Sequence, residues 1–241
     1  GQHDADAFFF ELMKGCFFHL ATALVRADVY RELGGFDTEL LSSEDYDMQL
    51  RLARTYKFAF SPRPTFIFRK HAGLRGANAI RYTATQRSTV FRRFDQRVGQ
   101  KLRASLALGE YLVPRQVGAL SIHEQRKGLM NRMEVMASKG CIPEMFEDLH
   151  LLLSSPHADG PLGADDAKRI SKAMRTGYAY EACRNAWSEF MDDIHELKAY
   201  PNGKSAIRAL ALGIFAMAKG YPDSFRGRLE KLRVAVGLAV V

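Results

Sequence analysis

The pattern of apolar positions changes near residue 98. Before it, short apolar runs alternate with turns. Residues 16–25 form a continuous apolar run, and residues 57–60 and 65–69 alternate with period two on either side of a proline-containing turn. Short runs of this kind predict β-strands, although the run at residues 16–25 also fits a helix. After Gly76 the strand signals vanish and the apolar positions recur at helical spacing.

Helices are predicted in both parts of the chain. The expected helical ranges are 5–14, 27–33, 44–56, 77–98, 100–112, 121–139, 143–154, 164–198, 203–219 and 223–239, with a break near Gly177. Ser121 and Glu124 have the spacing of a capping box. We therefore predict an α+β chain that is mostly α-helical, in which residues 1–98 contain a few short strands and residues 99–241 form a helical domain.

Composition narrows the class of protein. The 241 residues are 47% hydrophobic and 26% charged, which suffices for a buried core. Cys16, Cys141 and Cys183 are an odd number of isolated thiols, which argues against a disulfide framework and a zinc site. No apolar run approaches the ~20 residues of a membrane span. The net charge of +8 fits nucleic acid, anionic lipid or the phosphates of a sugar nucleotide.

Three motifs in the first part follow one another in a particular order. The first ends in the turn Gly34-Gly35-Phe36-Asp37, and the second is the acidic helix start Ser43-Glu44-Asp45. The third, Arg69-Lys70-His71, follows an apolar run. This order resembles family 2 glycosyltransferases, which have the GT-A fold, over residues 16–75. The resemblance implies that residues 1–98 are the acceptor-side, C-terminal half of such a domain, with a partial α/β region.

The resemblance also implies roles for these residues. In an inverting transfer the acceptor hydroxyl must lose its proton as the new bond forms, so a carboxylate has to lie beside it. The family's Glu-Asp pair corresponds to Glu44 and Asp45, with Asp45 as general base. His71 corresponds to a histidine that completes a Mg²⁺ or Mn²⁺ site, where the metal neutralises the departing diphosphate. The residues expected to contact the acceptor are Gly34, Gly35, Phe36, Asp37 and Arg69.

Simpler explanations exist for the same residues. Ser42 and Asp45 also have capping-box spacing, and a helix start favours carboxylates. A helix start lowers a carboxyl pKa, whereas a base benefits from a raised one. His71 also fits a solvated loop, and Arg51 is expected to pair with Glu44 or Asp47 on its own helix.

The family's nucleotide-binding half precedes the acceptor-side half. The chain opens with Gly1-Gln2-His3 rather than with methionine, and we expect it to be part of a longer or processed protein. Asp4-Ala5-Asp6 has the spacing of the family's metal motif but lies in an expected helix with no strand before it. The expected partners are a nucleotide-sugar donor and a carbohydrate or lipid-linked acceptor, and the fragment by itself is expected to be inactive.

Two segments, residues 81–103 and 204–241, are rich in basic residues, which is relevant to where in the cell the protein acts. The second mixes basic and apolar positions, which fits peripheral contact with the inner membrane, and the isolated thiols favour a cytoplasmic location. Ordinary packed helices with a solvated basic face would show the same pattern. Nucleic-acid binding is not expected, because no recognised motif accompanies the charge. The alternative to an enzyme part is a non-catalytic helical interaction or membrane-docking module. Oligomeric state, donor sugar and acceptor stay open.

Overall fold

The computed structural model describes residues 4–64, 66–67, 73–74, 80–83, 85–154, 157 and 160–220. The chain divides into two compact units, Gly1–Leu102 and Arg103–Val241. The boundary falls inside one helix, α4 (Arg87–Ser105). We call these parts unit 1 and unit 2.

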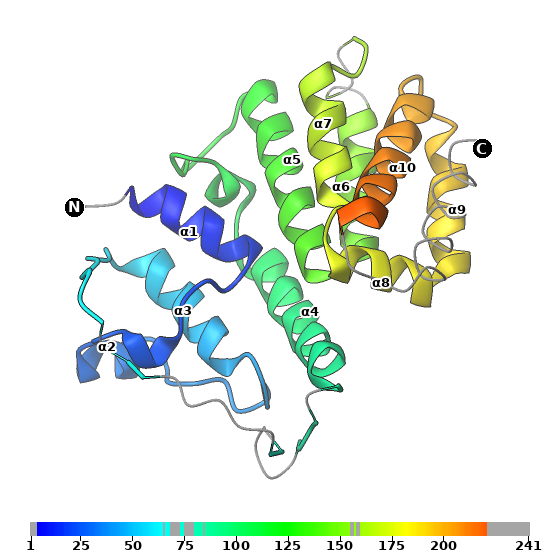
Figure 1. Ribbon diagram of the computed structural model, residues 1–241. Helices are drawn as coiled ribbons and strands as arrows, with labels where there is room; N and C mark the ends of the chain where they lie inside the picture. Colours follow the sequence, from blue (N-terminus) through cyan, green and yellow to red (C-terminus); the bar gives the residue numbers. More distant parts are fainter. Residues whose placement is uncertain are drawn as a thin grey trace. The chain divides into compact units, whose positions relative to one another are not determined.

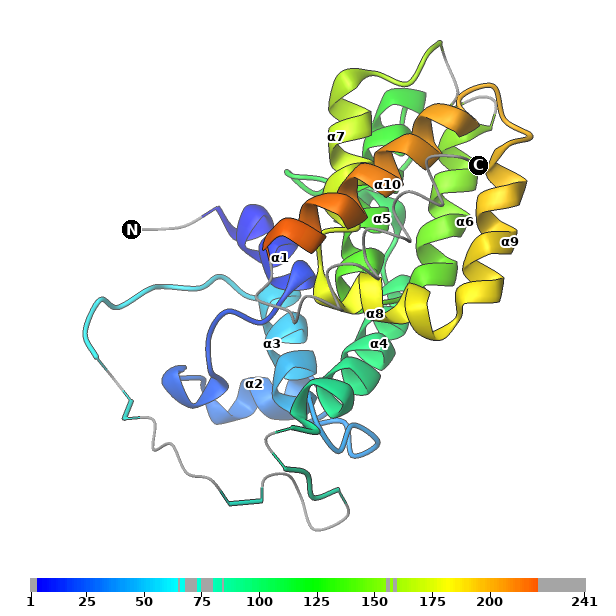
Figure 2. The ribbon, with the colours of Figure 1, turned by 45° about the vertical axis from the view of Figure 1, so that its right-hand side comes forward.

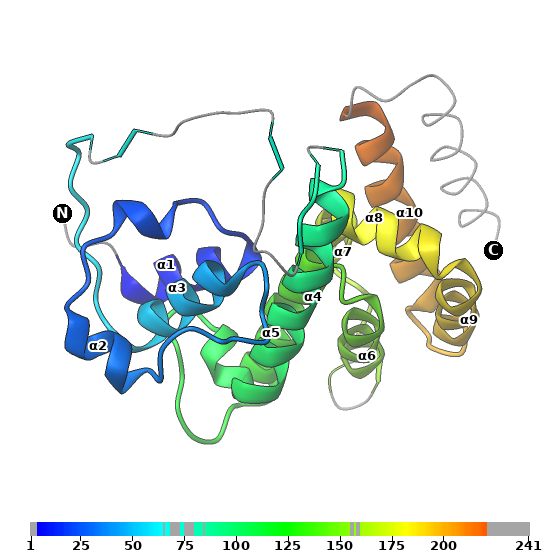
Figure 3. The ribbon, with the colours of Figure 1, turned by 90° about the horizontal axis from the view of Figure 1, so that it is seen from below.

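Unit 1 is built from short helices joined by long connections. Its elements are α1 (Ala5–Lys14), the 3₁₀ turn η1 (Leu20–Thr22), α2 (Ala27–Glu32), α3 (Glu44–Thr55) and most of α4. Helix α1 packs against α3 (Figure 3). Asp4 caps α1, because its Oδ1 accepts hydrogen bonds from the amides of Asp6 (2.9 Å) and Ala7 (3.2 Å). This explains the Asp4-Ala5-Asp6 sequence without a metal.

A small apolar core joins α2 to α3. Val29 on α2 and Met48 and Leu52 on α3 are almost completely buried. Partly buried residues pack around them: Leu20, Val25, Tyr30, Leu33, Tyr56 and Phe58. The same face of α3 that buries Met48 and Leu52 therefore fixes the position of α2 and of the segment before it.

The predicted strands are wrong for the residues that the structure describes. Residues 16–25 are irregular apart from η1, and Phe17 and Leu24 in this run are exposed. In the range 57–60 only Ala59 makes an isolated bridge; in 65–69 the described residues, 66–67, are irregular too. A strand needs a neighbour to pair its backbone groups, and the described residues contain no strand. The GT-A α/β region expected here is thus not supported, whereas the mostly helical character is confirmed.

Unit 2 is a bundle of helices around α5. Its elements are η2 (Leu108–Tyr111), α5 (Ile122–Lys139), α6 (Ile142–Leu153), α7 (Ala164–Ala173), α8 (Gly177–Asn185), α9 (Trp187–Leu197) and α10 (Gly203–Gly220). Helix α5 packs against α6, α7 and α8 (Figure 1). The capping box is confirmed: Ser121 Oγ accepts from the Glu124 amide at 3.3 Å, and Glu124 Oε2 accepts from the Ser121 amide at 2.8 Å.

Helix α10 packs closely on α7 (Figure 2). Gly213 makes this approach possible, because a Cβ there would lie 2.2 Å from the Ser171 carbonyl oxygen. Most described apolar positions of α10, including Leu210 and Ile214, are buried, while Leu212, Lys204 and Arg208 are exposed. Among the described helices, none is long and apolar enough to cross a membrane.

Candidate functional site

The acidic start of α3 is the centre of the site expected from the sequence. The residue that precedes α3 at the N-cap position is Ser43, not Ser42, so the alternative of a Ser42–Asp45 capping box is wrong. Ser43 has a left-handed backbone (φ 64°) and makes no side-chain cap bond to the helix. Glu44 and Asp45 lie in the first turn and are partly exposed. The Asp45 Oδ1 accepts a hydrogen bond from the Tyr46 amide at 2.8 Å.

The turn at residues 34–37 ends α2. The Gly35 amide donates to the Tyr30 carbonyl (2.8 Å) and the Gly34 amide to the Arg31 carbonyl (3.1 Å), the pattern of a Schellman motif. Both glycines have positive φ, 79° and 73°, which accounts for their identity. Phe36 is 46% exposed and stacks on Tyr30, with ring centroids 5.7 Å apart.

Asp47 connects this turn to α3. Its side chain is only 7% exposed, and it accepts from Arg51 Nε (2.9 Å) and Lys101 Nζ (2.6 Å). Arg51 also donates to the carbonyl oxygens of Leu33 (2.5 Å) and Gly35 (2.8 Å). The predicted pairing of Arg51 with Asp47 is confirmed, and the same guanidinium holds the Gly-Gly turn.

Lys101 on α4 binds two of these carboxylates at once. Its Nζ lies 2.6 Å from Asp37 Oδ2 as well as 2.6 Å from Asp47 Oδ1. The hydrogen bond from Lys101 lowers the pKa of the Asp37 carboxyl below its usual value. Burial acts to lower the pKa of Lys101, but its two carboxylate partners outweigh this and raise the pKa overall. Both groups are therefore held in their charged forms.

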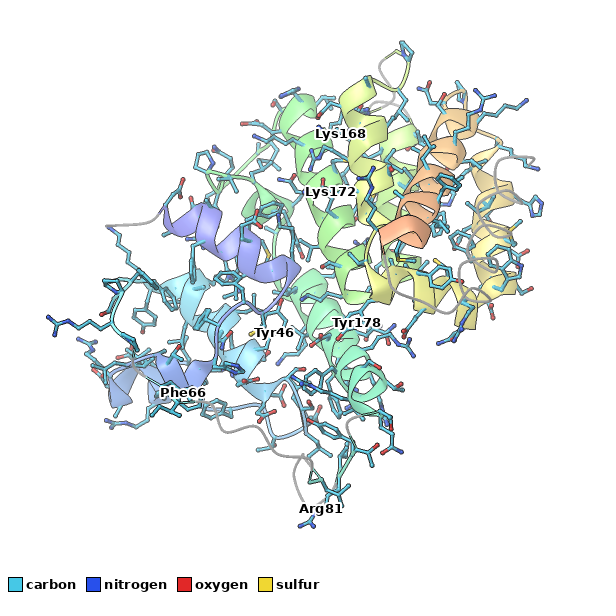
Figure 4. The ribbon with its side chains drawn as sticks, viewed as in Figure 1. Tyr46, Phe66, Arg81, Lys168, Lys172 and Tyr178 are labelled. Carbon is cyan, nitrogen blue, oxygen red and sulfur yellow. The ribbon has the colours of Figure 1, made fainter. Side chains whose placement is uncertain are left out.

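Two further residues of α3 attach it to the start of unit 1. The Tyr46 hydroxyl donates to the carbonyl oxygens of Leu12 (2.6 Å) and Met13 (3.1 Å) at the end of α1 (Figure 4). Burial raises the pKa of Tyr46 well above its ordinary value. Gln49 Nε2 donates to the Phe18 carbonyl at 3.1 Å. The faces of α3 that carry Tyr46, Asp47 and Gln49 are thus used in packing, and the partly exposed Asp45 is not among these contacts.

Two expected site residues, Arg69 and His71, lie outside the described residues. Within the described part, no group of three or more His, Cys, Asp or Glu side chains could hold a metal ion. The divalent-metal site that the resemblance implies depends on His71 and therefore stays a prediction.

Sequence reasoning missed most residues that hold the site. Asp95, Arg97 and Lys101 lie more than fifty positions after the loop that they contact, and no local pattern links them to it. The only available signal was the i,i+4 spacing of Asp47 and Arg51.

A second cluster of charges lies inside unit 2. Asp148 on α6 is completely buried and accepts from Arg132 Nη2 on α5 (2.7 Å) and from Arg103 Nη1 (2.9 Å). Arg103 also pairs with Glu147 at 2.6 Å. Because each charge has an opposite partner, this cluster is explained by the packing of α5 on α6.

Comparison with protein-family models, with curated proteins and with solved structures finds no match to this chain.

Proposed function

We propose that unit 1 carries the acceptor side of a glycosyltransferase that moves a sugar from a nucleotide-sugar donor to a carbohydrate or lipid-linked hydroxyl. The observation that supports this is the Asp47 network, in which Arg51 and Lys101 bind the turn at residues 34–37 to α3. Two motifs of the resemblance, separate in sequence, therefore belong to one packed arrangement around the start of α3.

The network also separates the roles of two neighbouring carboxylates. Asp47 is buried and both of its oxygens accept hydrogen bonds from Arg51 or Lys101, so an acceptor hydroxyl has little access to it. Asp45 is partly exposed on the first turn, where an acceptor hydroxyl can reach it. In this proposal Asp45 accepts the acceptor's proton, Glu44 lies beside it, and Phe36 and Asp37 contact the acceptor. Inversion at the anomeric carbon is taken from the resemblance alone.

We assign none of the described residues a role in binding the nucleotide-sugar donor. In the family the nucleotide-binding half precedes this region, and a divalent metal neutralises the diphosphate as it leaves. The activity is therefore proposed for the protein that carries both halves, and the 241-residue chain alone is expected to be inactive.

The test is a transfer assay on that longer protein with UDP-, GDP- and dTDP-sugars and Mn²⁺ or Mg²⁺. Asp45→Asn should lower turnover at least about a thousandfold with unchanged affinity for the donor. Asp28→Asn removes a partly exposed carboxylate from the first turn of α2 and is the matched control. Normal turnover by Asp45→Asn would show that Asp45 is not the general base.

One observation favours a second candidate, a non-catalytic helical interaction module. The described residues of unit 1 lack the sheet on which a GT-A site is built. Failure of the longer protein to transfer or hydrolyse any of the nucleotide sugars, while it still folds, would favour this alternative.

A further inference from the structure

The loop between α2 and α3, residues 33–43, carries the expected acceptor contacts but has no regular structure of its own. Three of its residues have positive φ: Gly34, Gly35 and Ser43. Such a loop loses much conformational freedom when it is held in one shape, so other contacts must offset that loss. The structure shows where those contacts come from.

The loop passes beside α4 (Figure 3), and side chains of α4 contact it at three positions. Near the middle of the loop, Asp37 pairs with Lys101 at 2.6 Å, and the Glu39 carbonyl oxygen accepts a longer bond of 3.4 Å from Arg97 Nη1. At the end of the loop, Ser43 Oγ donates to Asp95 Oδ1 at 2.9 Å. Asp95, Arg97 and Lys101 therefore hold the loop from its middle to its end.

The contact at Ser43 falls directly before Glu44 and Asp45. Ser43 is the one non-glycine residue with positive φ in the described part of the chain. A left-handed backbone is unfavourable for a residue with a side chain, so it persists only where the surroundings impose it. The hydrogen bond to Asp95 fixes this serine and thereby sets where the first turn of α3 begins.

The contact at Lys101 has a different effect. One ammonium group binds a carboxylate of the loop, Asp37, and a carboxylate of the helix, Asp47. Two short charge-assisted bonds on one atom fix the distance between the groups that they join. Lys101 therefore sets the position of the turn at residues 34–37 relative to α3.

We propose that α4 is the positioning element of the acceptor site: Asp95 and Lys101, assisted by Arg97, hold the loop at residues 33–43 where an acceptor beside Asp45 can bind it. The acceptor part of this inference rests on the proposed function. These residues act through the loop and are positioning residues, without contact to the reacting atoms.

The first test measures amide hydrogen exchange of peptides covering residues 33–43 in the intact chain. Lys101→Ala should raise exchange there about tenfold, since it removes two charge-assisted bonds. Asp95→Ala should raise exchange mainly around Ser43, and Lys101→Arg should restore protection because it retains a cation. Arg93→Ala is the matched control, since it removes one exposed cation from the same helix, where Arg93 lies over Phe94. Unchanged exchange in Lys101→Ala would overturn the proposal.

The second test separates positioning from general loss of structure. In the longer protein, Lys101→Ala should raise the KM for the acceptor about tenfold and leave kcat within about twofold, and Lys101→Arg should reverse the change. A fall in kcat at unchanged KM would refute the positioning role. If the unaltered protein shows no transfer at all, the proposed function fails and the acceptor role with it. The exchange rates still decide separately whether α4 holds the loop.

Discussion

Asp45 and Asp47 lie close together on α3, but we expect Asp47 to contribute much more than Asp45 to the stability of unit 1. Asp47 is buried between Arg51 and Lys101, so Asp47→Ala would leave two cations without their shared partner. We expect a loss of about 2–3 kcal/mol of unfolding free energy in unit 1, at the lower end for a broken buried pair because both cations are partly exposed. Native-state hydrogen exchange of α2 and α3 peptides measures it. Asp45→Ala should cost less than about 1 kcal/mol; equal losses would contradict this division of roles.

The ion pair of Asp37 and Lys101 makes unit 1 sensitive to pH. The folded-state pKa of Asp37 is below its ordinary value of 3.8, so its contribution is present above 3.8 and is lost as the pH falls through the lower folded value. Unit 1 of the unaltered chain should therefore be more stable than Asp37→Asn at about pH 7, and this difference should shrink at a pH below 3.8. Hydrogen exchange of unit 1 peptides at both pH values measures the difference. A difference that persists in acid would show that the carboxylate charge is not its source.

Lys101 has the opposite dependence on pH. Its pKa is raised above 10.5 in the folded state, so its contribution is present below 10.5 and is lost as the pH rises through the folded value. Loosening of the loop at residues 33–43 is accordingly expected only in strong alkali. The candidate site should keep its shape across the neutral range.

Among individual residues, the sequence predicted what depends on local spacing. Each feature that was predicted joins residues only a few positions apart: Glu44 and Asp45 at a helix start, Gly34 and Gly35 in a turn, and Arg51 with Asp47. The contacts of Lys101 and Asp95 join positions more than fifty residues apart. Only the packed structure brings such residues together, and one sequence contains no pattern that reports it.

At the scale of elements, the close contact of α10 with α7 depends on Gly213. A methyl group at this position would overlap the Ser171 carbonyl and lie 2.8 Å from Met174 Cβ. Gly213→Ala should therefore destabilise unit 2 by about 1–3 kcal/mol, although alanine favours helices. Urea unfolding followed by Trp187, the only tryptophan, reports the change. Leu212→Ala, at a position 61% exposed on the same helix, is the control and should change little.

Helices were predicted better than strands for a physical reason. A helix satisfies its backbone within one segment, so its apolar period and its caps are visible locally, as at Ser121 and Glu124. A strand depends on a partner elsewhere in the chain. The apolar run at 16–25 fitted a buried strand, but Phe17 instead packs edge-on against Phe8 of α1, with ring centroids 5.4 Å apart. The start of α4 at Arg87, ten residues after the predicted start at 77, was also missed.

For the whole molecule, the division into two units limits where function can be looked for. The expected acceptor residues that are described lie in unit 1, together with the residues that hold them. In unit 2 the completely buried Asp148 is neutralised by Arg132 of the neighbouring helix. This buried charge cluster is therefore explained by packing and supports no separate proposal about chemistry.

The net charge of +8 leads to a prediction about membranes. On α10 most of the described apolar residues are buried whereas Lys204 and Arg208 are exposed, and sequence positions 226–233 add four more basic residues. Adsorption to phosphatidylglycerol vesicles should thus be electrostatic: strong at about 0.05 M salt and lost at about 0.5 M. Co-sedimentation measures the bound fraction. Lys204→Glu with Arg208→Glu should reduce it more than Lys168→Glu with Lys172→Glu, the same charge change on α7. Equal reductions would indicate general charge attraction, and adsorption that survives high salt would indicate apolar insertion instead.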